Sequence, residues 1–493
     1  MKKFLHFILA GKGVIIYYAI LLAIMISWTS FTSFPPTPLR LAFLGLVLLP
    51  AIIDRNSIMP AVLICFWGIA INGYSYSYMP TMSYLYVGIL VVLLPFMWRS
   101  CKSHVSYTGM ELIPILTCFI LIRDLIGDLE IQDNVMAFTI IALLPYYIDK
   151  WDRKAIDKMG TAFMVMSVVL SYYSFTTQSL FTGEYGSFAG QERSVWADPN
   201  YLSVAMGTGA LIGVNQTIHF KEANTLNRIL GPIAFAITVP AMLSLASRGG
   251  MLCLFTGAII ILAFSKVNPV IKTVMILAAV GFMIFLYTNS FFDMLEERIN
   301  SDDGTGSERT VIWQNRLNAF ASSENPLNIL FGYSFHGGLK LGWPFEYGSH
   351  NDFVAFLAQY GITGLLLFLG FLGLPVINLR GSKEHRVEVY AGTVYLGLAS
   401  MTLEPFSAGR IMTFMFWFYL TLLPVMANNT RQKNRAMKEL MEQFQQTDTY
   451  RNKVCDRHIS RPNETNGLND ISMRDNDSIG SGRTHKTLLS QTP

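Results

Sequence analysis

Long apolar segments recur along most of this 493-residue chain. A helix needs roughly 20 apolar residues to cross the hydrocarbon core of a bilayer, and shorter runs suffice when they are tilted or flanked by anchors. The sequence therefore predicts about fourteen transmembrane helices, at residues 13–33, 39–54, 59–74, 81–98, 108–126, 132–149, 156–176, 200–218, 228–246, 249–265, 268–288, 351–379, 387–404 and 409–428. Charged residues make up only 14% of the chain, against roughly 25% in soluble domains. We expect an all-α integral membrane protein.

The basic residues give the orientation, because the cytoplasmic loops of membrane proteins carry an excess of lysine and arginine. With a cytoplasmic N-terminus, the inner side carries seventeen basic residues before the C-terminal tail and the outer side carries nine. We therefore expect both termini in the cytoplasm. On this topology residues 1–428 form the membrane domain, with long outward loops at 177–199 and 289–350. Residues 429–493 form a cytoplasmic tail, a short helix followed by disorder.

Composition also excludes several classes of function. The net charge of +4 is small and spread along the chain, so we expect no nucleic-acid partner. The five cysteines have no metal-type spacing, and neither a zinc site nor a disulfide framework is indicated. No phosphate-binding glycine loop and no outward cluster of carboxylates with metal spacing is present. We expect no cofactor and no metal.

The two sides of the predicted membrane domain differ in the kind of basic residue they carry. Eleven of the seventeen inward residues are lysine, whereas eight of the nine outward ones are arginine. Topology alone is satisfied by lysine, but the planar guanidinium group grips phosphate oxygens with two hydrogen bonds. This pattern favours an outward ligand that bears phosphate. Chance in a small sample is the alternative.

His350 is the candidate for proton transfer. Of the eight histidines, only His336 and His350 face outward. His350 lies in GSHNDFVAFLAQYGITG, where Ser349 and Asp352 indicate the start of a helix. The positive end of the helix dipole and nearby arginines disfavour a charged imidazole, so we expect a neutral ring that can act as a general base. A polar residue that only marks the helix start is the alternative.

Two arginines lie beside predicted helix starts on the outer side. Arg248, in LSLASRGGMLCLF, must sit at the mouth of the helix bundle because the connection is so short. An arginine there is costly unless it is paired or faces a wet cavity, which makes it a candidate binding residue. An arginine extended toward the interface is the alternative. Arg193 shortly precedes the turn Asp198–Pro199–Asn200.

An amphipathic helix is predicted inside the second outward loop, in SERTVIWQNRLNAFA. Ser307 would cap it, and its apolar stripe would consist of Ile312, Trp313, Leu317 and Phe320. Spacings of four and three residues align Arg309, Trp313 and Arg316 on one side. We expect Arg309 and Arg316 to bind substrate. A surface helix that rests on the membrane is the alternative.

Taken in order, these segments resemble the bacterial O-antigen ligase and O-antigen polymerase family. ADPNYLS is similar to its D/N-P-N element, SRGG to its S-R-G element, and ERTVIW and NPLNILFGYSF to its R-x-x-x-W and P-L-x-x-x-x-G elements. SHNDFVAFLAQYGITGLL resembles the histidine element that closes the large outward loop. The resemblance covers about residues 185–375. The first six spans carry nothing diagnostic.

The resemblance implies a membrane glycosyltransferase of the GT-C kind in the bacterial inner membrane, with a large periplasmic loop over a cavity. Its donor would be a glycan linked to undecaprenyl pyrophosphate, and its acceptor a glycan or lipid A-core. By motif, Arg248 and Arg309 would hold the donor pyrophosphate, and His350 would activate the acceptor hydroxyl. The reaction would invert the anomeric configuration without a metal. Arg193 and Arg316 have no strict motif position.

The sequence leaves two points open, namely the role of two acidic residues beside the motifs and the class of function. Glu308 and Glu346 stand beside the motifs, and either could pair with an arginine or orient His350. A lipid-linked glycan flippase or other secondary transporter would also have many spans and buried arginines. Such a transporter predicts inverted repeats and broken helices near the bilayer midplane, in place of a long outward loop that ends in histidine. A non-catalytic envelope-assembly subunit is a third reading.

Overall fold

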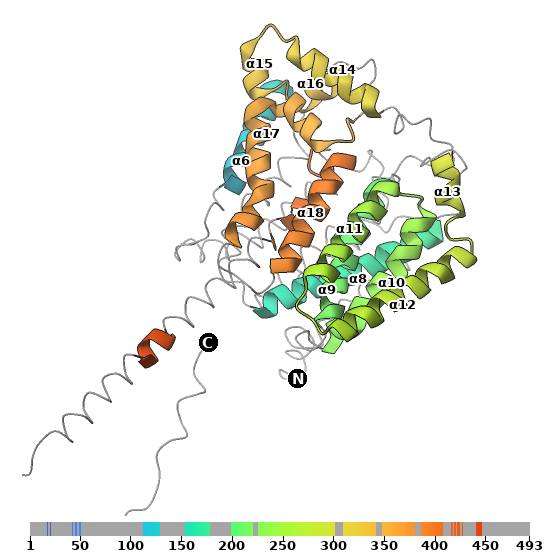
Figure 1. The fold of residues 1–493 in the computed structure, drawn as a ribbon. Helices are drawn as coiled ribbons and strands as arrows, with labels where there is room; N and C mark the ends of the chain where they lie inside the picture. The colour runs from blue at the N-terminus through green and yellow to red at the C-terminus, as the bar shows by residue number, and fades with distance from the viewer. Residues whose placement is uncertain are drawn as a thin grey trace, which may run out of the picture. The chain divides into compact units, whose positions relative to one another are not determined.

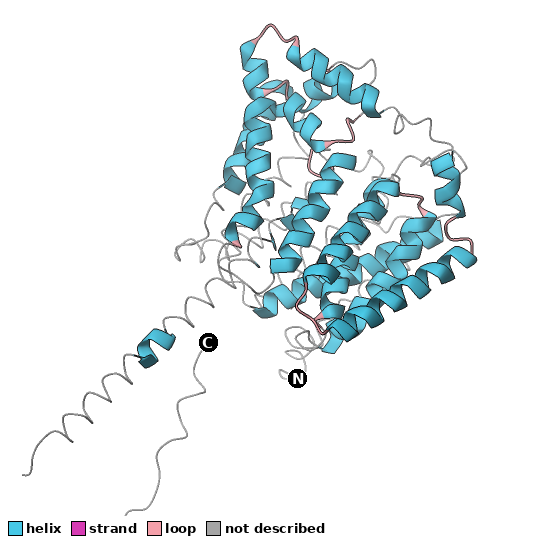
Figure 2. Cartoon of the chain, in the orientation of Figure 1, coloured by secondary structure: helices cyan, strands magenta, loops and turns pink. Residues whose placement is uncertain are grey.

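The computed structural model describes residues 112–128, 153–177, 199–219, 225–300, 309–341, 348–379, 386–407 and 440–445, with single positions between 17 and 50 and between 416 and 426. Every regular element among these residues is a helix (Figure 2). The chain divides into two compact units, residues 1–435 and 436–493. The helices discussed below all belong to the first unit.

The helices of this unit are shown in Figure 1. They are α6 (Leu112–Asp128), α8 (Arg153–Thr177), α9 (Pro199–Ile218), α10 (Thr225–Ser244), α11 (Arg248–Phe264), α12 (Pro269–Thr288), α13 (Asp293–Asn300), α14 (Arg309–Ala321), α15 (Pro326–Phe331), α16 (Phe335–Lys340), α17 (Asp352–Asn378) and α18 (Arg386–Thr402). Eight of them, all but α13 to α16, coincide with predicted spans. The predicted spans 13–33, 39–54, 59–74, 81–98, 132–149 and 409–428 lie outside the described residues, apart from single positions.

Three described helices are long and apolar enough to cross a bilayer: Leu226–Ser244 within α10, all of α12, and α17. The apolar α11 is shorter. α12 is exposed along almost its entire length, and only Leu286 in it is buried. An apolar helix exposed on most sides fits a hydrocarbon environment and would be unfavourable in water.

Helices α8, α9 and α10 pack closely because small residues lie where they cross. A Cβ atom on Gly213 of α9 would lie only 2.6 Å from the carbonyl oxygen of Gly231 of α10. Hydroxyl groups join the same helices, with Ser167 Oγ of α8 lying 2.9 Å from Thr238 Oγ1 of α10. Close backbone contact and interhelical hydrogen bonds replace the hydrophobic effect as the source of helix association in lipid.

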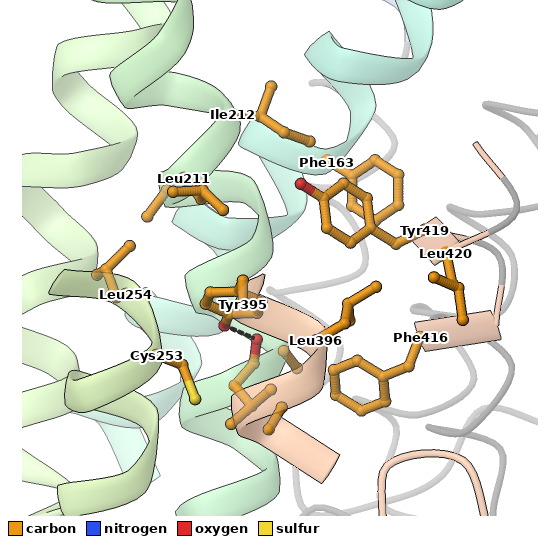
Figure 3. Packing of buried hydrophobic residues seen from close by; sticks show 14 of the residues in the cluster. Phe163, Leu211, Ile212, Cys253, Leu254, Tyr395, Leu396, Phe416, Tyr419 and Leu420 are labelled. Carbon is orange, nitrogen blue, oxygen red and sulfur yellow. Dashed lines mark hydrogen bonds between the residues drawn. The ribbon is translucent and has the colours of Figure 1, made fainter. Parts of the chain in front are cut away.

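Helix α18 packs against α9 and α11 through a buried aromatic and aliphatic core. The Tyr395 hydroxyl of α18 donates to the Val204 carbonyl of α9 at 2.5 Å (Figure 3). Leu211, Leu254 and Tyr419 fill the space around it. This packing fixes the position of α18, whose C-terminal end carries the site described below.

Helix α17 reverses direction at Gly361. This glycine has φ 66 and ψ −168, which no helical residue adopts. The rings of Phe356 and Phe368 stack with centroids 4.3 Å apart, whereas twelve residues of straight helix would separate them by roughly 18 Å. Residues 352–360 therefore fold back along residues 362–378. The predicted limits 351–379 match α17, which is long and apolar enough to cross a bilayer, but the helix is interrupted at Gly361.

The reversal leaves carbonyl groups without helical partners, and the preceding loop supplies partners for them. The Tyr333 amide donates to Ala358 O at 3.0 Å, and the Ser334 amide donates to Gln359 O at 2.8 Å. Gly332, with φ 75, brings this segment against the α17 backbone, where a Cβ atom would meet the Gln359 carbonyl group. Residues 332–334 thus complete the hydrogen bonding of the reversal.

The end of α6 holds the same segment from the other side. The Arg123 guanidinium donates to Phe331 O at 3.0 Å and to Gly332 O at 2.6 Å. The buried Asp124 carboxylate accepts from the Phe335 amide at 3.1 Å and from the Tyr360 hydroxyl at 3.1 Å. The sequence had indicated no role for α6. In the structure, α6 holds residues 331–335 against the reversal of α17 through these hydrogen bonds.

Gly332→Ala is expected to destabilise the protein by about 1–3 kcal/mol, because alanine disfavours a left-handed φ and its methyl group would displace the α17 backbone. Gly373→Ala in α17 is the matched control, since a Cβ atom there meets nothing within 4 Å. Thermal stability of the detergent-solubilised protein, followed by gel filtration after heating, measures both. Equal melting of the two variants would contradict this account of the reversal.

Candidate active site at the end of helix α18

The segments that carry the predicted motifs converge on the C-terminal end of α18. The Arg309 guanidinium of α14 donates to Thr402 O at 2.8 Å. The backbone N–H of Asp352 at the start of α17 donates to Leu403 O at 3.2 Å. The first turn of α11 packs against the same residue as Arg309, since a Cβ atom on Gly249 would lie 3.0 Å from Thr402 Oγ1. Segments far apart in the sequence therefore share one neighbour.

Helix α14 places its aligned polar side chains on other parts of the site. The Trp313 indole donates to Ser349 O at 2.6 Å, directly before His350. Arg316 donates to Leu339 O at 3.0 Å and is fully buried. The helix lies over α17 and α18 (Figure 1). The expected alignment of Arg309, Trp313 and Arg316 is confirmed, because all three reach neighbouring protein segments.

The predicted apolar stripe of α14 was wrong at one position. Ile312 and Phe320 are buried as expected, but Leu317 is 42% exposed and Arg316 lies on the buried side between them. Spacings of four residues place Ile312, Arg316 and Phe320 on one face. Arg316 can be buried because it pairs with Glu404, which is 88 residues away in the sequence. A local hydrophobicity pattern cannot predict such a partner. The predicted cap Ser307 lies outside the described residues.

His350 adopts a left-handed backbone conformation, with φ 50. Histidine tolerates this region better than most residues, yet the conformation persists only where the surroundings enforce it. Here both neighbours are held. Asn351 caps α17 by accepting from the amides of Phe353 at 2.9 Å and Val354 at 3.2 Å. The expected helix start is confirmed, with α17 beginning at Asp352, and Ser349 bonds to Glu404 with its amide and its hydroxyl.

Asp352 ties the first residue of α17 to the loop after α18. Its carboxylate accepts from the amides of Phe406 at 3.2 Å and Ser407 at 2.9 Å, and from the Ser407 hydroxyl at 2.7 Å. The side chain is fully buried. A carboxylate removed from water needs such donors, so the loop 403–407 and the His350 segment can only fold together.

Arg248 is the first residue of α11, and the turn before it is tightly defined. Ala246 has φ 49, and Ser247 caps the helix by accepting from the Gly250 amide at 3.3 Å. The Ser247 hydroxyl donates to Asn200 Oδ1 of α9 at 3.2 Å. Arg248 itself is only half-buried. The guanidinium therefore starts from a rigid turn beside Thr402.

Glu404 is the residue that the sequence analysis missed. Its side chain is 3% exposed, and its carboxylate lies 3.9 Å from Arg316 Nη1 and accepts from Ser349. Its backbone N–H donates to the Tyr201 hydroxyl of α9 at 3.3 Å. Burial lowers the pKa of Arg316, and the negative charge of Glu404 partly offsets that effect. An acid at the outer end of an apolar run was the signal that could have identified it.

The structure brings together three of the five predicted site residues as partly exposed groups: Arg248, Arg309 and His350. Arg316 stands behind them in the buried network. Arg193, Glu308 and Glu346 lie outside the described residues. No group of three or more His, Cys, Asp or Glu side chains within the described ranges could hold a metal ion.

The arrangement combines two guanidinium groups with one imidazole at the starts of three helices. Arg248 opens α11, Arg309 opens α14, and His350 precedes the cap of α17. Helix N-termini carry partial positive charge and favour anions, so the dipoles act in the same direction as the arginines. The site suits an anion next to a group that exchanges a proton.

Removing the charge of Glu404 is expected to destabilise the protein by about 3–5 kcal/mol, because it leaves the buried Arg316 cation without its counter-charge. Glu404→Gln keeps an oxygen for Ser349 and changes only the charge. Arg316→Met in the same chain removes the cation, so the double variant should melt closer to wild type than Glu404→Gln alone. Additive destabilisation of the two substitutions would show that the charges do not interact.

Comparison with known proteins matches part of this chain to a family model. Residues 233–369 match the family model described as O-antigen ligase, a segment that includes α11, α14, α15, α16 and the reversal in α17. No curated protein matches the chain. Together with the apolar helices, the match supports a coarse role in glycan biosynthesis at a membrane. Over residues 233–369 this chain is similar to the O-antigen ligase family, and the resemblance that its motifs indicated is confirmed.

Proposed function

We propose that this protein is an inverting, metal-independent glycosyltransferase of the bacterial inner membrane. It transfers a glycan from undecaprenyl pyrophosphate to an acceptor hydroxyl on the periplasmic face, within a GT-C-like bundle. The acceptor is lipid A-core or another glycan chain, so the enzyme acts as a ligase or a polymerase in surface polysaccharide biosynthesis. Both reactions use the same chemistry and differ only in the acceptor.

The convergence of Arg248, Arg309 and His350 on the end of α18 carries this proposal. Arg309 reaches Thr402 O directly, and Arg248 starts the helix that packs on Thr402. His350 stands between Ser349, which bonds to Glu404, and Asn351, whose side-chain amide donates to Met401 O at the end of α18. Glycosyl transfer from a pyrophosphate calls for cationic groups that stabilise the leaving group and for a group that accepts the hydroxyl proton.

In the proposed step, the acceptor hydroxyl oxygen attacks the anomeric carbon of the donor sugar. The bond from that carbon to the pyrophosphate oxygen breaks, and its electron pair leaves with undecaprenyl pyrophosphate. The hydroxyl proton passes to the neutral His350 imidazole. Arg248 and Arg309 stabilise the charge that develops on the leaving oxygen, as do the positive ends of α11 and α14. Attack opposite the leaving group inverts the anomeric centre.

The remaining predicted residues take supporting roles in this proposal. Arg316 has no exposed surface, so it acts by holding Glu404, and Glu404 holds Ser349 next to His350. Trp313 holds the same residue through its carbonyl oxygen. These are positioning residues, since they reach the substrate only through their neighbours. Arg193 stays a candidate contact for the donor on the basis of its sequence position.

His350→Ala is expected to abolish glycan transfer, because the proposed step passes the hydroxyl proton to the His350 imidazole. Complementation of a deletion strain, with surface glycan resolved on a gel and protein level checked by immunoblot, measures this. His336→Ala is the matched control: it is the other outward histidine, and it lies against the Phe335 ring at 5.1 Å in α16. Full glycan from His350→Ala would refute the catalytic role.

The same gel distinguishes the two acceptors. A polymerase defect leaves single repeat units on lipid A-core, whereas a ligase defect leaves lipid A-core without any repeat.

A second assay, cleavage of the donor lipid by a glycosidase added on the periplasmic side, tests the transporter alternative. A transporter defect would leave the donor lipid on the inner side of the membrane, where the glycosidase cannot reach it. Wild-type donor accessibility together with lost transfer therefore supports an enzyme.

Arg248→Lys and Arg309→Lys are expected to reduce activity by at least tenfold, because lysine keeps the charge but loses the two-pronged grip on phosphate. The alanine variants should be weaker still. Initial transfer rates in membrane vesicles, with a synthetic polyprenyl-pyrophosphate donor, measure the series. If lysine and alanine variants both match wild type, neither arginine binds the donor.

A further inference from the structure

The short helix α15 presents apolar side chains away from the protein, although it lies in the large outward loop. Leu327 is 60% exposed, Leu330 is 46% exposed and Phe331 is 41% exposed. No residue of α15 is buried. In a water-filled loop, three neighbouring large apolar side chains would form an exposed patch of the kind that marks an interaction surface.

This patch continues the surface of two helices that run into the membrane domain. The ring of Phe331 lies 6.4 Å from that of Phe119 on α6. On the two neighbouring helices, Ile362 and Leu366 of α17 are 41% and 61% exposed, and Ile126 of α6 is 75% exposed. Helices α15, α17 and α6 are packed together through the Gly332–Gly361 contact and the Arg123 hydrogen bonds. The apolar surface is therefore shared by all three.

The length of α17 beyond its reversal gives the depth of the patch. Residues 362–378 carry no charge and, at 1.5 Å per residue, span roughly 25 Å, close to the roughly 30 Å of a bilayer core. If residue 378 is placed at the inner boundary of the bilayer core, residue 362 lies near the outer boundary. Helix α15 is attached at that end of the segment. Arg123 and Asp124 lie at the same level, and Arg309 and Glu404 lie on the side of the loop that faces the protein.

We propose that α15 is a membrane-interface anchor: Leu327, Leu330 and Phe331 insert among the lipid chains of the outer leaflet. A short helix with one apolar face and fixed ends needs no span of its own to be held at the interface. The anchor fixes the height of residues 309–341, and with them α14, relative to the lipid surface. A surface helix that rests on the membrane was the alternative for α14. In the structure, however, Ile312 and Phe320 of α14 are buried against the protein.

Site-directed spin labelling tests this without reference to enzyme activity. Single cysteines replace Leu327 and Leu330 in the full-length chain, after substitution of the five native cysteines. Leu366→Cys on α17 is the lipid-facing control, and Glu324→Cys, exposed in the turn before α15, is the aqueous control. Each variant carries a nitroxide and is reconstituted in phosphatidylethanolamine–phosphatidylglycerol vesicles. Oxygen reports lipid exposure, and a water-soluble nickel chelate reports exposure to water.

The labels at Leu327 and Leu330 are expected to collide with oxygen at least several-fold more, relative to the nickel chelate, than the label at Glu324. Their ratio should approach that of Leu366. A ratio equal to that of Glu324 would overturn the proposal, because the patch would then face water. Exclusion of both reagents would also overturn it and would indicate a protein partner. Gel filtration before reconstitution confirms that each variant is folded.

Discussion

Backbone polar groups near lipid must find their hydrogen-bond partners inside the protein, and in this molecule that constraint links the parts of the site. The reversal at Gly361 interrupts α17 at a point where Ala358, Gln359 and Gly361 are all buried. The carbonyl groups of Ala358 and Gln359 then depend on the amides of Tyr333 and Ser334. A loop that has to supply those amides cannot move freely. Its docking on the reversal fixes α15 and α16 on either side and determines where the large outward loop lies.

The second level of organisation is a set of buried polar and charged groups that bond to one another. Asp352 draws the loop 403–407 onto the start of α17, and Glu404 in that loop draws in Ser349 and Arg316. Each of these groups would carry a large desolvation penalty alone. The network therefore forms as a unit or not at all. Such cooperativity can hold His350 in a left-handed conformation that an isolated loop would abandon.

Hydropathy predicted the described helices well because lipid imposes a simple requirement on length and polarity. The limits of α9 and α12, for example, were predicted within a residue or so. The reversal in α17 was missed for the same reason: FLAQYGITGLLLF is mostly apolar and carries no charge, and hydropathy does not register the φ of Gly361. The glycine spacing was visible in the motif, but only its contact with Gly332 explains it.

The site shows a similar division. Arg248, Arg309 and His350 could be selected from the sequence because their residue types and sides are unusual for an apolar chain. Glu404 could not be selected with the same confidence, since its role depends on Arg316, 88 residues away, being buried. Leu317 and Arg316 exchange their expected environments for this reason. Charge pairs between distant segments depend on the fold, so they cannot be predicted from the residue pattern of one segment.

The geometry also explains why the proposed chemistry is assembled from helix ends. Arg248, Arg309 and His350 each lie at the start of a helix, whereas the group that collects them is the C-terminal end of α18. The exposed carbonyl groups of that end accept the amide of Asp352 and the guanidinium of Arg309, so opposite dipole ends meet. The starts of α11 and α14 both lie next to Thr402 and bring two further positive helix ends to this region. A pyrophosphate placed there would meet fixed dipoles and arginines with little rearrangement, which is the condition for stabilising a leaving group electrostatically.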